Sequence, residues 1–480
     1  MRAVDFSDVQ GLLRFAYRRL PDTRYCLLRI RDAASAQAWL SDAPISTAEI
    51  QSPPPTVAVQ VAFTPSGLRQ LGLRDQIIAS FAPEFVNGIA GEANRSRRLG
   101  DVADNAPPRW HWGGPTDRID LLVILFAAHG QMDAWQQNIC GPAWAQAFEE
   151  VRVLTTTDMQ GREPFGFIDG ISQPQLDWDL RRDVARDQID YTNLVALGEF
   201  VLGYPNEYGK FTERPLLDPA YEGSADLLPA ADDPGRRDLG CNGTYLVLRQ
   251  LEQHVDAFWN FVNRSTTASL TGKPLAEAML GRRFDDGAPL APVAASPIEG
   301  IATAPGDAQN NFTYVQDAAG LRCPFGAHIR RANPRNTDFP NRPTGLLSRT
   351  FAMLGGSASA VRDDLIASTR FHRLLRRGRE YGAPAPSPEP TGIHFVSLNA
   401  NISRQFEFVQ NAWIMNGKFN ALEDESDPLL GAAGRPFSVP REDKCPARVT
   451  EIPSFISVRG GAYFFMPGLR ALRYIACAAK

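Results

Sequence analysis

The chain has 480 residues, of which 44% are hydrophobic and 22% are charged. These values are ordinary for a soluble globular protein, and the length allows two or more packed cores, so disorder is not expected. The formal net charge of −4 and the pI near 6.0 give no electrostatic basis for binding nucleic acid or an anionic membrane surface.

The chain shows no sign of export or membrane insertion. Residues 1–22 contain no apolar stretch followed by a small-residue cleavage site, which a secretory signal needs. The most apolar run, IDLLVILFAA at residues 119–128, is too short for a membrane-spanning helix, which takes about 20 apolar residues. The six cysteines are scattered without CxxC spacing, so disulfides and structural zinc are not expected. A reducing, cytoplasmic location fits best.

The first third of the chain alternates between helical and strand patterns. The expected elements are helices over residues 10–20, 33–40, 65–71 and from 131 onward, and strands over residues 24–31, 56–63 and 120–128. This alternation of short elements is typical of a mixed α and β unit.

A long connection separates this region from a second unit of the same kind. Residues 183–240 are rich in Pro, Gly and Asp and keep neither a helical nor a strand period. The elements expected after it are strands over residues 243–249, 394–398 and 462–465, and helices over residues 251–262 and 405–413. The pattern predicts two α+β units joined by a looped insertion.

Several common catalytic motifs are missing from the sequence. There is no GxxxxGK[ST] phosphate loop, because the TGK at residues 271–273 runs into Pro274 and lacks the upstream glycine. There is also no GxSxG nucleophile elbow and no HExxH zinc motif. Nucleoside triphosphate, serine hydrolase and zinc protease chemistry are therefore unsupported.

One carboxylate stands between glycines in an apolar segment, the GxxDG motif at residues 166–170. Partial burial would raise the pKa of Asp169, and a carboxyl that takes and returns a proton suits acid-base chemistry. From the local sequence alone, the commoner role for such an aspartate is to cap a turn before Gly170.

Two further segments combine histidine and arginine. His328 lies next to three arginines in CPFGAHIRRANPR at residues 323–335, where an imidazole can bind iron and cations can pair with haem carboxylates. The basic run HRLLRRGREYG occupies residues 372–382. Taken singly, the first segment equally suits a structural histidine, and the second a solvated helix face.

Together these three segments resemble the dye-decolourising peroxidase family. The resemblance extends to GIHFVSLNANISRQFEFVQNAW at residues 392–413 and to DPLLG at residues 427–431. Five segments therefore match in the same order, over residues 163–431.

The resemblance implies an α+β fold of two ferredoxin-like halves with antiparallel β-sheets and peripheral helices, and a haem held mainly by the C-terminal half. We expect residues 1–182 to form the first half with the GxxDG motif, 183–240 the connection, and 241–480 the haem-binding half. One haem b per chain is the implied cofactor.

The resemblance also assigns roles to particular residues. His328 is the expected axial ligand of the haem iron, and Asp427 the carboxylate that accepts a hydrogen bond from it. Asp169 is the expected distal acid-base group. Arg376, preferred over its neighbour Arg377, is the expected cation that stabilises negative charge as the O–O bond breaks.

Further residues are assigned in the same way. Ile393, where the family often has leucine, and Phe395 are expected to line the distal pocket. Arg330, with Arg331 second, is expected to contact a haem propionate, and a surface charge is the alternative role for both. Tyr381 and Trp413 match positions from which some members pass electrons to bulky donors at the surface. Packing is the alternative role for these two rings.

The implied function is a peroxidase that reduces hydrogen peroxide and oxidises phenolic or dye-like donors by one-electron steps through a ferryl intermediate. The expected partners are peroxide and small or bulky reducing donors, without nucleic acid or membrane, and a homo-oligomer is left open. The alternatives are a haem-binding storage or sensing protein with little turnover, and a structural α+β protein without haem.

Overall fold

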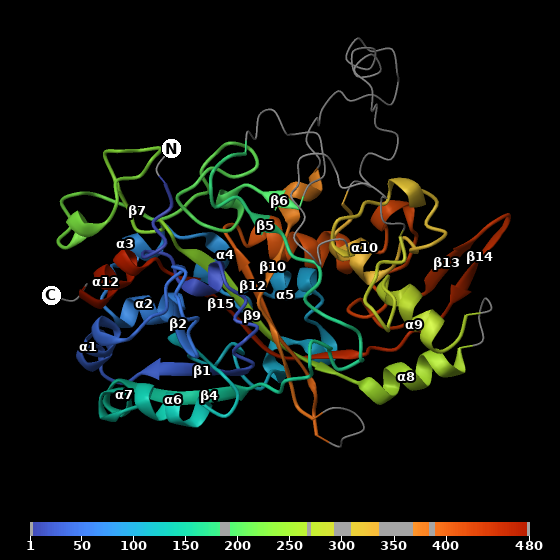
Figure 1. The fold of residues 1–480 in the computed structure, drawn as a ribbon, viewed down its shortest axis with the longest axis horizontal. Helices are drawn as coiled ribbons and strands as arrows, with labels where there is room; N and C mark the ends of the chain where they lie inside the picture. Colours follow the sequence, from blue (N-terminus) through green and yellow to red (C-terminus); the bar gives the residue numbers. More distant parts are fainter. Residues whose placement is uncertain are drawn as a thin grey trace, which may run out of the picture.

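The computed structural model describes residues 3–182, 193–265, 270–291, 309–335, 368–383 and 389–477 (Figure 1). Its centre is a nine-stranded sheet in the order β10-β12-β9-β15-β2-β3-β1-β4, and β11 also pairs with β12. Every neighbouring pair in this sheet is antiparallel. The first four strands of the chain form one end of this order, and the later strands form the other.

The N-terminal unit has the ferredoxin-like arrangement. Its strands are β1(Asp22–Ile30), β2(Val57–Phe63), β3(Leu121–Ala127) and β4(Phe148–Thr155). Its helices are α1(Ala33–Asp42), α2(Pro65–Gln70), α3(Asp75–Ile78), α4(Pro83–Asn87), α5(Ala93–Leu99), α6(Met132–Ile139) and α7(Pro142–Ala147). The spatial order β2-β3-β1-β4, with helices after β1 and between β3 and β4, is that of a β-α-β-β-α-β unit.

The C-terminal unit repeats this arrangement. Its sheet strands are β9(Thr244–Gln253), β10(Leu375–Arg376), β11(Arg379–Tyr381), β12(Gly392–Asn399) and β15(Ile456–Met466), and β13(Phe437–Arg441) and β14(Lys444–Val449) form a separate hairpin. The helices are α8(Val255–Arg264), α9(Lys273–Leu280), α10(His328–Ala332) and α12(Leu469–Cys477). Because the order β10-β12-β9-β15 matches that of the first unit, the predicted α+β fold with two ferredoxin-like halves is confirmed.

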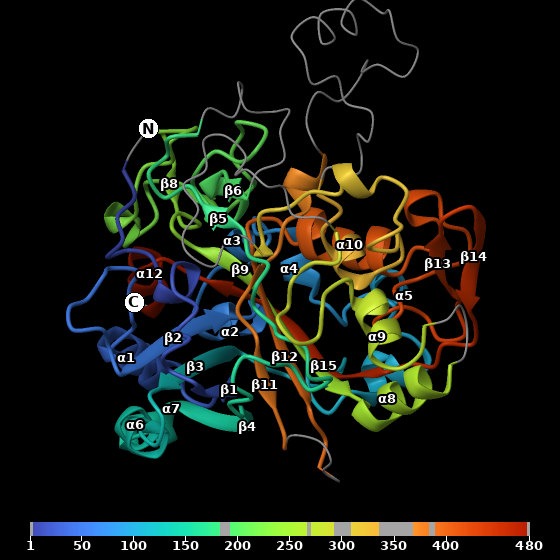
Figure 2. The same cartoon turned by 45° about the vertical axis from the view of Figure 1, so that its right-hand side comes forward.

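The two halves meet edge to edge within one sheet. Strands β15 and β2 are antiparallel neighbours, and Phe465 of β15 lies opposite Phe63 of β2. Figures 1 and 2 show the strands of both halves side by side, with α8, α9, α10 and the β13–β14 hairpin beyond the strands of the second half. The sheet is thus continuous, although the two units follow each other along the chain.

The core lies on both faces of the sheet. One face packs against α1, α7 and α12, and the other packs against residues 9–20 and 195–204. All seven residues of β3 are buried, because this strand lies inside the sheet and is covered on both faces. This is why its sequence reads as a continuous apolar run rather than as an alternating pattern.

The predicted helix over residues 10–20 is wrong. The structure has only the 3₁₀ turn η1(Gly11–Leu13) there, and Tyr17 has a φ of 50° that interrupts a helix. The Gln10 amide instead exchanges two hydrogen bonds with the backbone of Val61 in β2, each 2.9 Å long. The apolar residues of this segment are buried against the sheet without helical geometry.

Other predictions need smaller corrections. The helix expected over residues 251–262 begins at Val255, because β9 continues to Gln253 and pairs there with β15. The helix expected over residues 405–413 is present but wound as two π-helices, η10(Ser403–Glu407) and η11(Val409–Ile414). Strand β4 was not predicted. Its charged residues Glu149, Glu150 and Arg152 interrupt the alternation of apolar and polar residues that marks a strand.

The expected connection contains little regular structure where it is described. Residues 183–192 lie outside the described residues, and residues 193–240 contain turns and the short strands β6(Leu194–Val195), β7(Leu216–Leu217) and β8(Arg237–Asp238). Strand β6 pairs with β5(Gln175–Leu176), and β7 pairs with β8. The boundaries of the three expected domains stay predictions.

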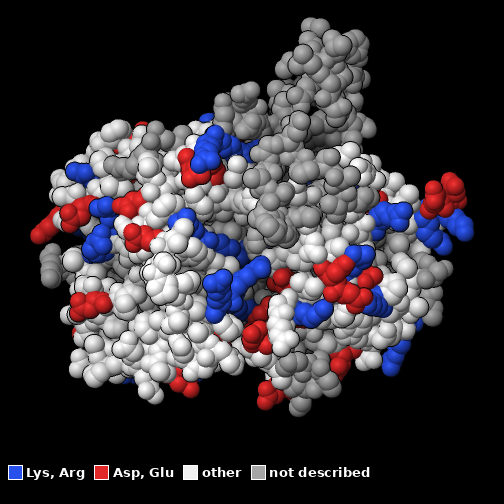
Figure 3. All heavy atoms as spheres, in the orientation of Figure 1, with Lys and Arg blue, Asp and Glu red and all other residues white. Residues whose placement is uncertain are grey.

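The surface carries charges of both signs. On the face shown in Figure 3, basic and acidic side chains of the described residues are interspersed, which agrees with a net charge of only −4. Among the helices that the structure describes, none is long and apolar enough to cross a membrane.

Truncation of a β3 side chain tests the importance of this strand for stability. Leu125 is fully buried in the core, so we expect Leu125→Ala to lower the free energy of unfolding by about 2–5 kcal/mol through lost burial and a cavity. Urea unfolding followed by circular dichroism measures the change. Arg152→Ala, at an exposed position of β4, is the control, with an expected change within about 0.5 kcal/mol. Equal effects would contradict the prediction.

Candidate active site

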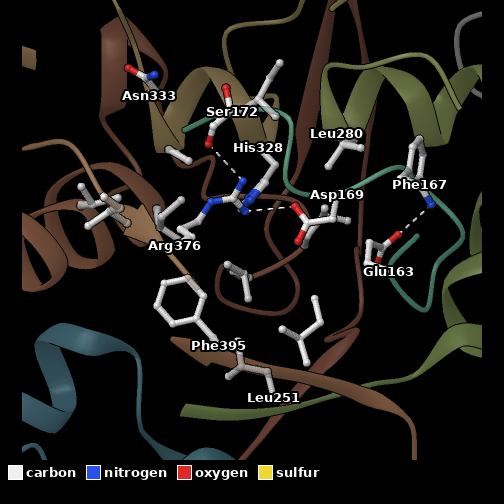
Figure 4. Close-up of a pocket in the computed structure, with 18 of the residues that line it drawn as sticks. Glu163, Phe167, Asp169, Ser172, Leu251, Leu280, His328, Asn333, Arg376 and Phe395 are labelled. Atoms are coloured by element: carbon white, nitrogen blue, oxygen red, sulfur yellow. Dashed lines mark hydrogen bonds and ion pairs between the residues drawn. The ribbon is translucent and has the colours of Figure 1, made fainter. Parts of the chain in front are cut away.

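A cavity of about 250 Å³ lies where the GxxDG loop meets the C-terminal unit (Figure 4). Its walls come from residues 163–174, the start of α10, strands β9 and β12, and the π-helices. The predicted residues His328, Asp169 and Arg376 all line it. Segments more than 150 residues apart in the chain therefore contribute to one site.

His328 is fixed by a buried carboxylate. Its Nδ1 lies 2.8 Å from Oδ2 of Asp427, whose Oδ1 accepts the N–H groups of Leu429 and Leu430 at 2.9 Å each. Burial alone lowers the pKa of His328, but the Asp427 carboxylate raises it above its ordinary value. Because an ionised carboxylate only accepts hydrogen bonds, Nδ1 carries the proton and Nε2 is left to bind another group.

Asp169 is held against a guanidinium. Nη1 of Arg376 donates to Oδ1 of Asp169 at 3.2 Å, and Nη2 donates to the carbonyl of Ser172 at 3.3 Å (Figure 4). Gly170 follows with a φ of 76°, a conformation that favours glycine and turns the chain directly after the carboxylate. Burial raises the pKa of Asp169, yet Arg376 holds it below its usual value.

The apolar walls include both predicted pocket residues. Ile393 and Phe395 line the cavity from β12, and they lie on the same face of this strand because side chains two apart point the same way. Leu251 of β9 and Phe406 of η10 complete this wall. The polar groups therefore face a largely apolar space, where electrostatic interactions are strong.

The structure does not place Arg330 at the cavity, which corrects its expected role. Arg330 is fully buried; it donates to Oδ2 of Asp317 at 3.2 Å and to the carbonyl of Cys323 at 2.7 Å. Arg331 donates to backbone carbonyls, among them that of Trp413. The reason is helical geometry: two residues beyond His328 in α10, a side chain points roughly opposite to it.

The two aromatic residues expected at the surface are both buried. Tyr381 is 7% exposed and stacks on His394 with ring centroids 4.4 Å apart. Trp413 is 8% exposed and packs edge-on against His372 at 5.2 Å. Neither ring lies at the surface position that the sequence predicted.

Arg282 is a cavity residue that the sequence analysis missed. Its Nη1 donates to the carbonyls of Gly287 and Gln309, and Nη2 donates to Oγ of Ser172. Burial, together with the nearby Arg335, lowers the pKa of Arg282 to about 10. Within the described part of the chain no carboxylate pairs with this buried cation. Only the fold brings Arg282 to the cavity, so no local sequence signal marks it.

The described residues contain no group of three or more His, Cys, Asp or Glu side chains that could hold a metal ion. In this part of the structure the cavity offers the single imidazole of His328 rather than a cluster of protein ligands.

Known proteins that are similar in sequence to this chain are dye peroxidases. No family model matches the chain. A multifunctional dye peroxidase of an Amycolatopsis species is 28% identical over 446 aligned residues, covering 86% of this chain and 81% of the relative. A dye-decolorizing peroxidase of Mycetinis scorodonius is 27% identical over 506 aligned residues, covering 98% and 88%.

The chain is similar in sequence and in fold to dye-decolourising peroxidases. Solved structures of dye-decolourising peroxidases share its fold: that of Auricularia auricula-judae has a TM-score of 0.72 at 23% identity, covering 99% of this chain and all of the other. That of an Anabaena species has a TM-score of 0.70 at 22% identity, covering 98% and 94%. The predicted resemblance to dye-decolourising peroxidases is confirmed.

The Asp427 contacts can be tested through stability. Asp427→Ala removes the acceptor of three hydrogen bonds, so we expect the free energy of unfolding to fall by about 1–3 kcal/mol. Asp427→Asn keeps an acceptor oxygen and should cost less. Glu423→Ala, at an exposed position nearby, is the control. Urea unfolding compares the three variants, and an alanine variant at position 427 as stable as the control would refute the argument.

Proposed function

We propose that this chain is a haem-dependent peroxidase that reduces hydrogen peroxide and oxidises phenolic or dye-like donors by one-electron steps. The observation that carries the proposal is the meeting of His328, backed by Asp427, with the Asp169–Arg376 pair in one apolar cavity. The relatives named above are dye peroxidases. The proposal includes one haem b per chain and a cytoplasmic location.

The cavity residues fit a haem. A porphyrin supplies most of the ligands of a haem iron, so the single imidazole nitrogen of His328 would suffice as the protein ligand. The hydrogen bond to Asp427 increases the basicity of that nitrogen. Ile393 and Phe395 offer apolar contacts to the ring. In place of Arg330 we propose Arg282, with Arg373 second, as partners of the haem propionates, because both line the cavity and Arg282 is a buried cation suited to an anionic group.

A haem held by these residues would supply the redox chemistry with peroxide and with donors. Asp169 would accept a proton from one oxygen of peroxide and return it to the other oxygen, which leaves as water. The guanidinium of Arg376, fixed by Ser172, stabilises the negative charge that develops between these steps.

The donor must either enter the cavity or pass its electrons to the cavity through side chains. One solved dye-decolorizing peroxidase with this fold, at a TM-score of 0.69 and 22% identity, is a complex with 2,6-dimethoxyphenol, and a small phenol is accordingly the donor we propose for direct tests. Tyr381 and Trp413 stay proposed electron carriers for bulky donors, acting from buried positions.

The absorption spectrum of haem-reconstituted protein mixed with hydrogen peroxide tests the proposal. We expect a Soret band in the wild type that changes on mixing, no stable haem binding in His328→Ala, and a reaction slowed by about 10²–10⁴-fold in Asp169→Asn. Asp133→Asn, on the exposed side of α6, is the matched control. A haem spectrum that peroxide leaves unchanged would favour storage or sensing instead.

The Arg376–Asp169 pair predicts a shift in pH dependence. Asp169 accepts a proton only when ionised, so the rate of the peroxide reaction falls as the pH drops through its pKa. Arg376 keeps that pKa low, so Arg376→Ala should move this acidic limb to higher pH and slow the reaction by about 10²–10³-fold. Stopped-flow rates across pH measure both effects, with the exposed Arg473→Ala as the control. If the fall in rate at acidic pH stays at the same pH in Arg376→Ala, the proposed effect of Arg376 on the pKa of Asp169 is wrong.

A further inference from the structure

Two consecutive residues of the loop that follows the GxxDG motif hold Arg376. The carbonyl of Ser172 accepts Nη2 of its guanidinium at 3.3 Å, and the backbone N–H of Arg376 donates to Oε1 of Gln173 at 3.0 Å. Figure 4 shows the guanidinium joined to Ser172 on one side and to Asp169 on the other. The Ser172–Gln173 pair therefore fixes both the main chain and the side chain of Arg376.

The side chain of Asn310 holds both residues of this pair. Its Nδ2 donates to the carbonyl of Gln173 at 2.8 Å, and its Oδ1 accepts the hydroxyl of Ser172 at 3.0 Å. Asn310 is 3% exposed and is not one of the residues that line the cavity. A single buried amide thus uses its donor and its acceptor on the two residues that hold Arg376.

Arg335 sets the orientation of the Asn310 amide. Its Nη2 donates to Oδ1 of Asn310 at 3.1 Å and to Oγ of Ser172 at 3.2 Å, and its Nη1 donates to the carbonyl of Asn310 at 2.8 Å. Because an arginine only donates hydrogen bonds, the amide oxygen faces Arg335 and the amide nitrogen faces Gln173. Arg335 is 1% exposed and lies 3.8 Å from the centre of the Phe312 ring, so this support is packed in the interior.

The hydroxyl group of Ser172 has a full set of partners. Its oxygen accepts Nη2 of Arg282 at 3.3 Å and Nη2 of Arg335 at 3.2 Å, and its proton goes to Asn310. A hydroxyl group has one proton to donate and two lone pairs to accept. Without the Asn310 oxygen, the hydroxyl proton would lose its acceptor while both guanidinium groups remain beside it.

These contacts place the motif loop against the rest of the fold. Gln173 and Asn310 are 137 residues apart in the chain, and Asp169 and Arg376 are 207 residues apart. The distance between Asp169 and Arg376 therefore depends on how the loop is seated. Loss of the two Asn310 contacts would free the Ser172–Gln173 pair to shift relative to Arg376.

We propose that Asn310 is a positioning residue for the peroxide reaction, which acts on Arg376 through the Ser172–Gln173 pair. This inference rests on the proposed function. Because Asn310 lies outside the cavity lining, its effect on the reaction passes through the residues that it holds. Misplacement of a catalytic group by about 1 Å can cost about 10²-fold in rate, so a residue one contact away from Arg376 can affect the reaction.

The infrared band of carbon monoxide bound to the reduced, haem-loaded protein tests the proposal without turnover. This band lies apart from those of the protein, and a cation beside the bound molecule lowers its frequency. We expect Arg376→Ala to move the band to higher frequency, and Asn310→Ala to move it in the same direction. A band that moves in Arg376→Ala but stays at its wild-type position in Asn310→Ala overturns the proposal.

Asn206→Ala is the matched control for this measurement. Asn206 is 4% exposed, and its Oδ1 accepts the backbone N–H groups of Tyr208 and Lys210 in a turn of the connection. The variant therefore removes an equally buried amide that holds two neighbouring residues, but away from the cavity. The carbon monoxide band should keep its wild-type frequency in this variant.

A double-mutant cycle shows whether Asn310 acts through Arg376. We expect Asn310→Ala to slow the reaction with peroxide about tenfold in the wild-type background and less than about twofold in the Arg376→Ala background, where the positioned group is gone. Stopped-flow absorption measures the four rates. Equal slowing in both backgrounds would mean that the amide has a general structural role, and the proposal would be refuted.

A second substitution guards against misfolding of Asn310→Ala. Asn310→Asp keeps the size of the side chain and the acceptor of Ser172 and Arg335, but it turns an oxygen toward the carbonyl of Gln173 in place of the donor. The carbon monoxide band should again move to higher frequency, and a wild-type band would count against the proposal. Thermal unfolding checks that both variants are folded.

This inference and the proposed function fail in different ways. If the wild-type protein binds haem but does not react with peroxide, the proposed function fails, while the carbon monoxide band still decides whether Asn310 positions Arg376. If the wild type reacts with peroxide and Asn310→Ala changes neither the band nor the rate, only this inference fails.

Discussion

The ion pair between Arg376 and Asp169 joins the two halves of the chain at the cavity. Asp169 belongs to the segment that follows the N-terminal half-sheet, and Arg376 lies on β10 of the C-terminal half. With His328 on α10, the site exists only when both halves are folded and in register. The two half-sheets that carry these segments are joined where Phe465 of β15 pairs with Phe63 of β2.

Sequence patterns predicted the elements whose apolar period is unambiguous. Strands β1, β2, β3 and β9 were found because their apolar residues are regular, whereas residues 10–20 were misassigned as helix. That segment has a helical period but satisfies its polar groups through Gln10 and β2 instead. Such tertiary hydrogen bonds leave no trace in the local sequence.

The same limit applies to the site. His328, Asp169, Arg376 and Asp427 were named from motifs, and the structure brings all four to one place. The expected propionate partner Arg330 follows its ligand by two residues, and helical geometry turns it away into a buried pair with Asp317. Arg282 and Glu163 face the cavity because distant segments fold around it, so their proximity is a property of the fold rather than of any motif.

The edge-to-edge junction between the half-sheets has a consequence for fragments of this protein. A chain cut within the connection would separate β2 from β15, which pair at Phe63 and Phe465, and would leave both facing strand edges open to other strands. Such edges recruit other strands, so an isolated half would tend to self-associate or to swap strands with another copy. Coexpressed halves, by contrast, would each present the edge that the other lacks.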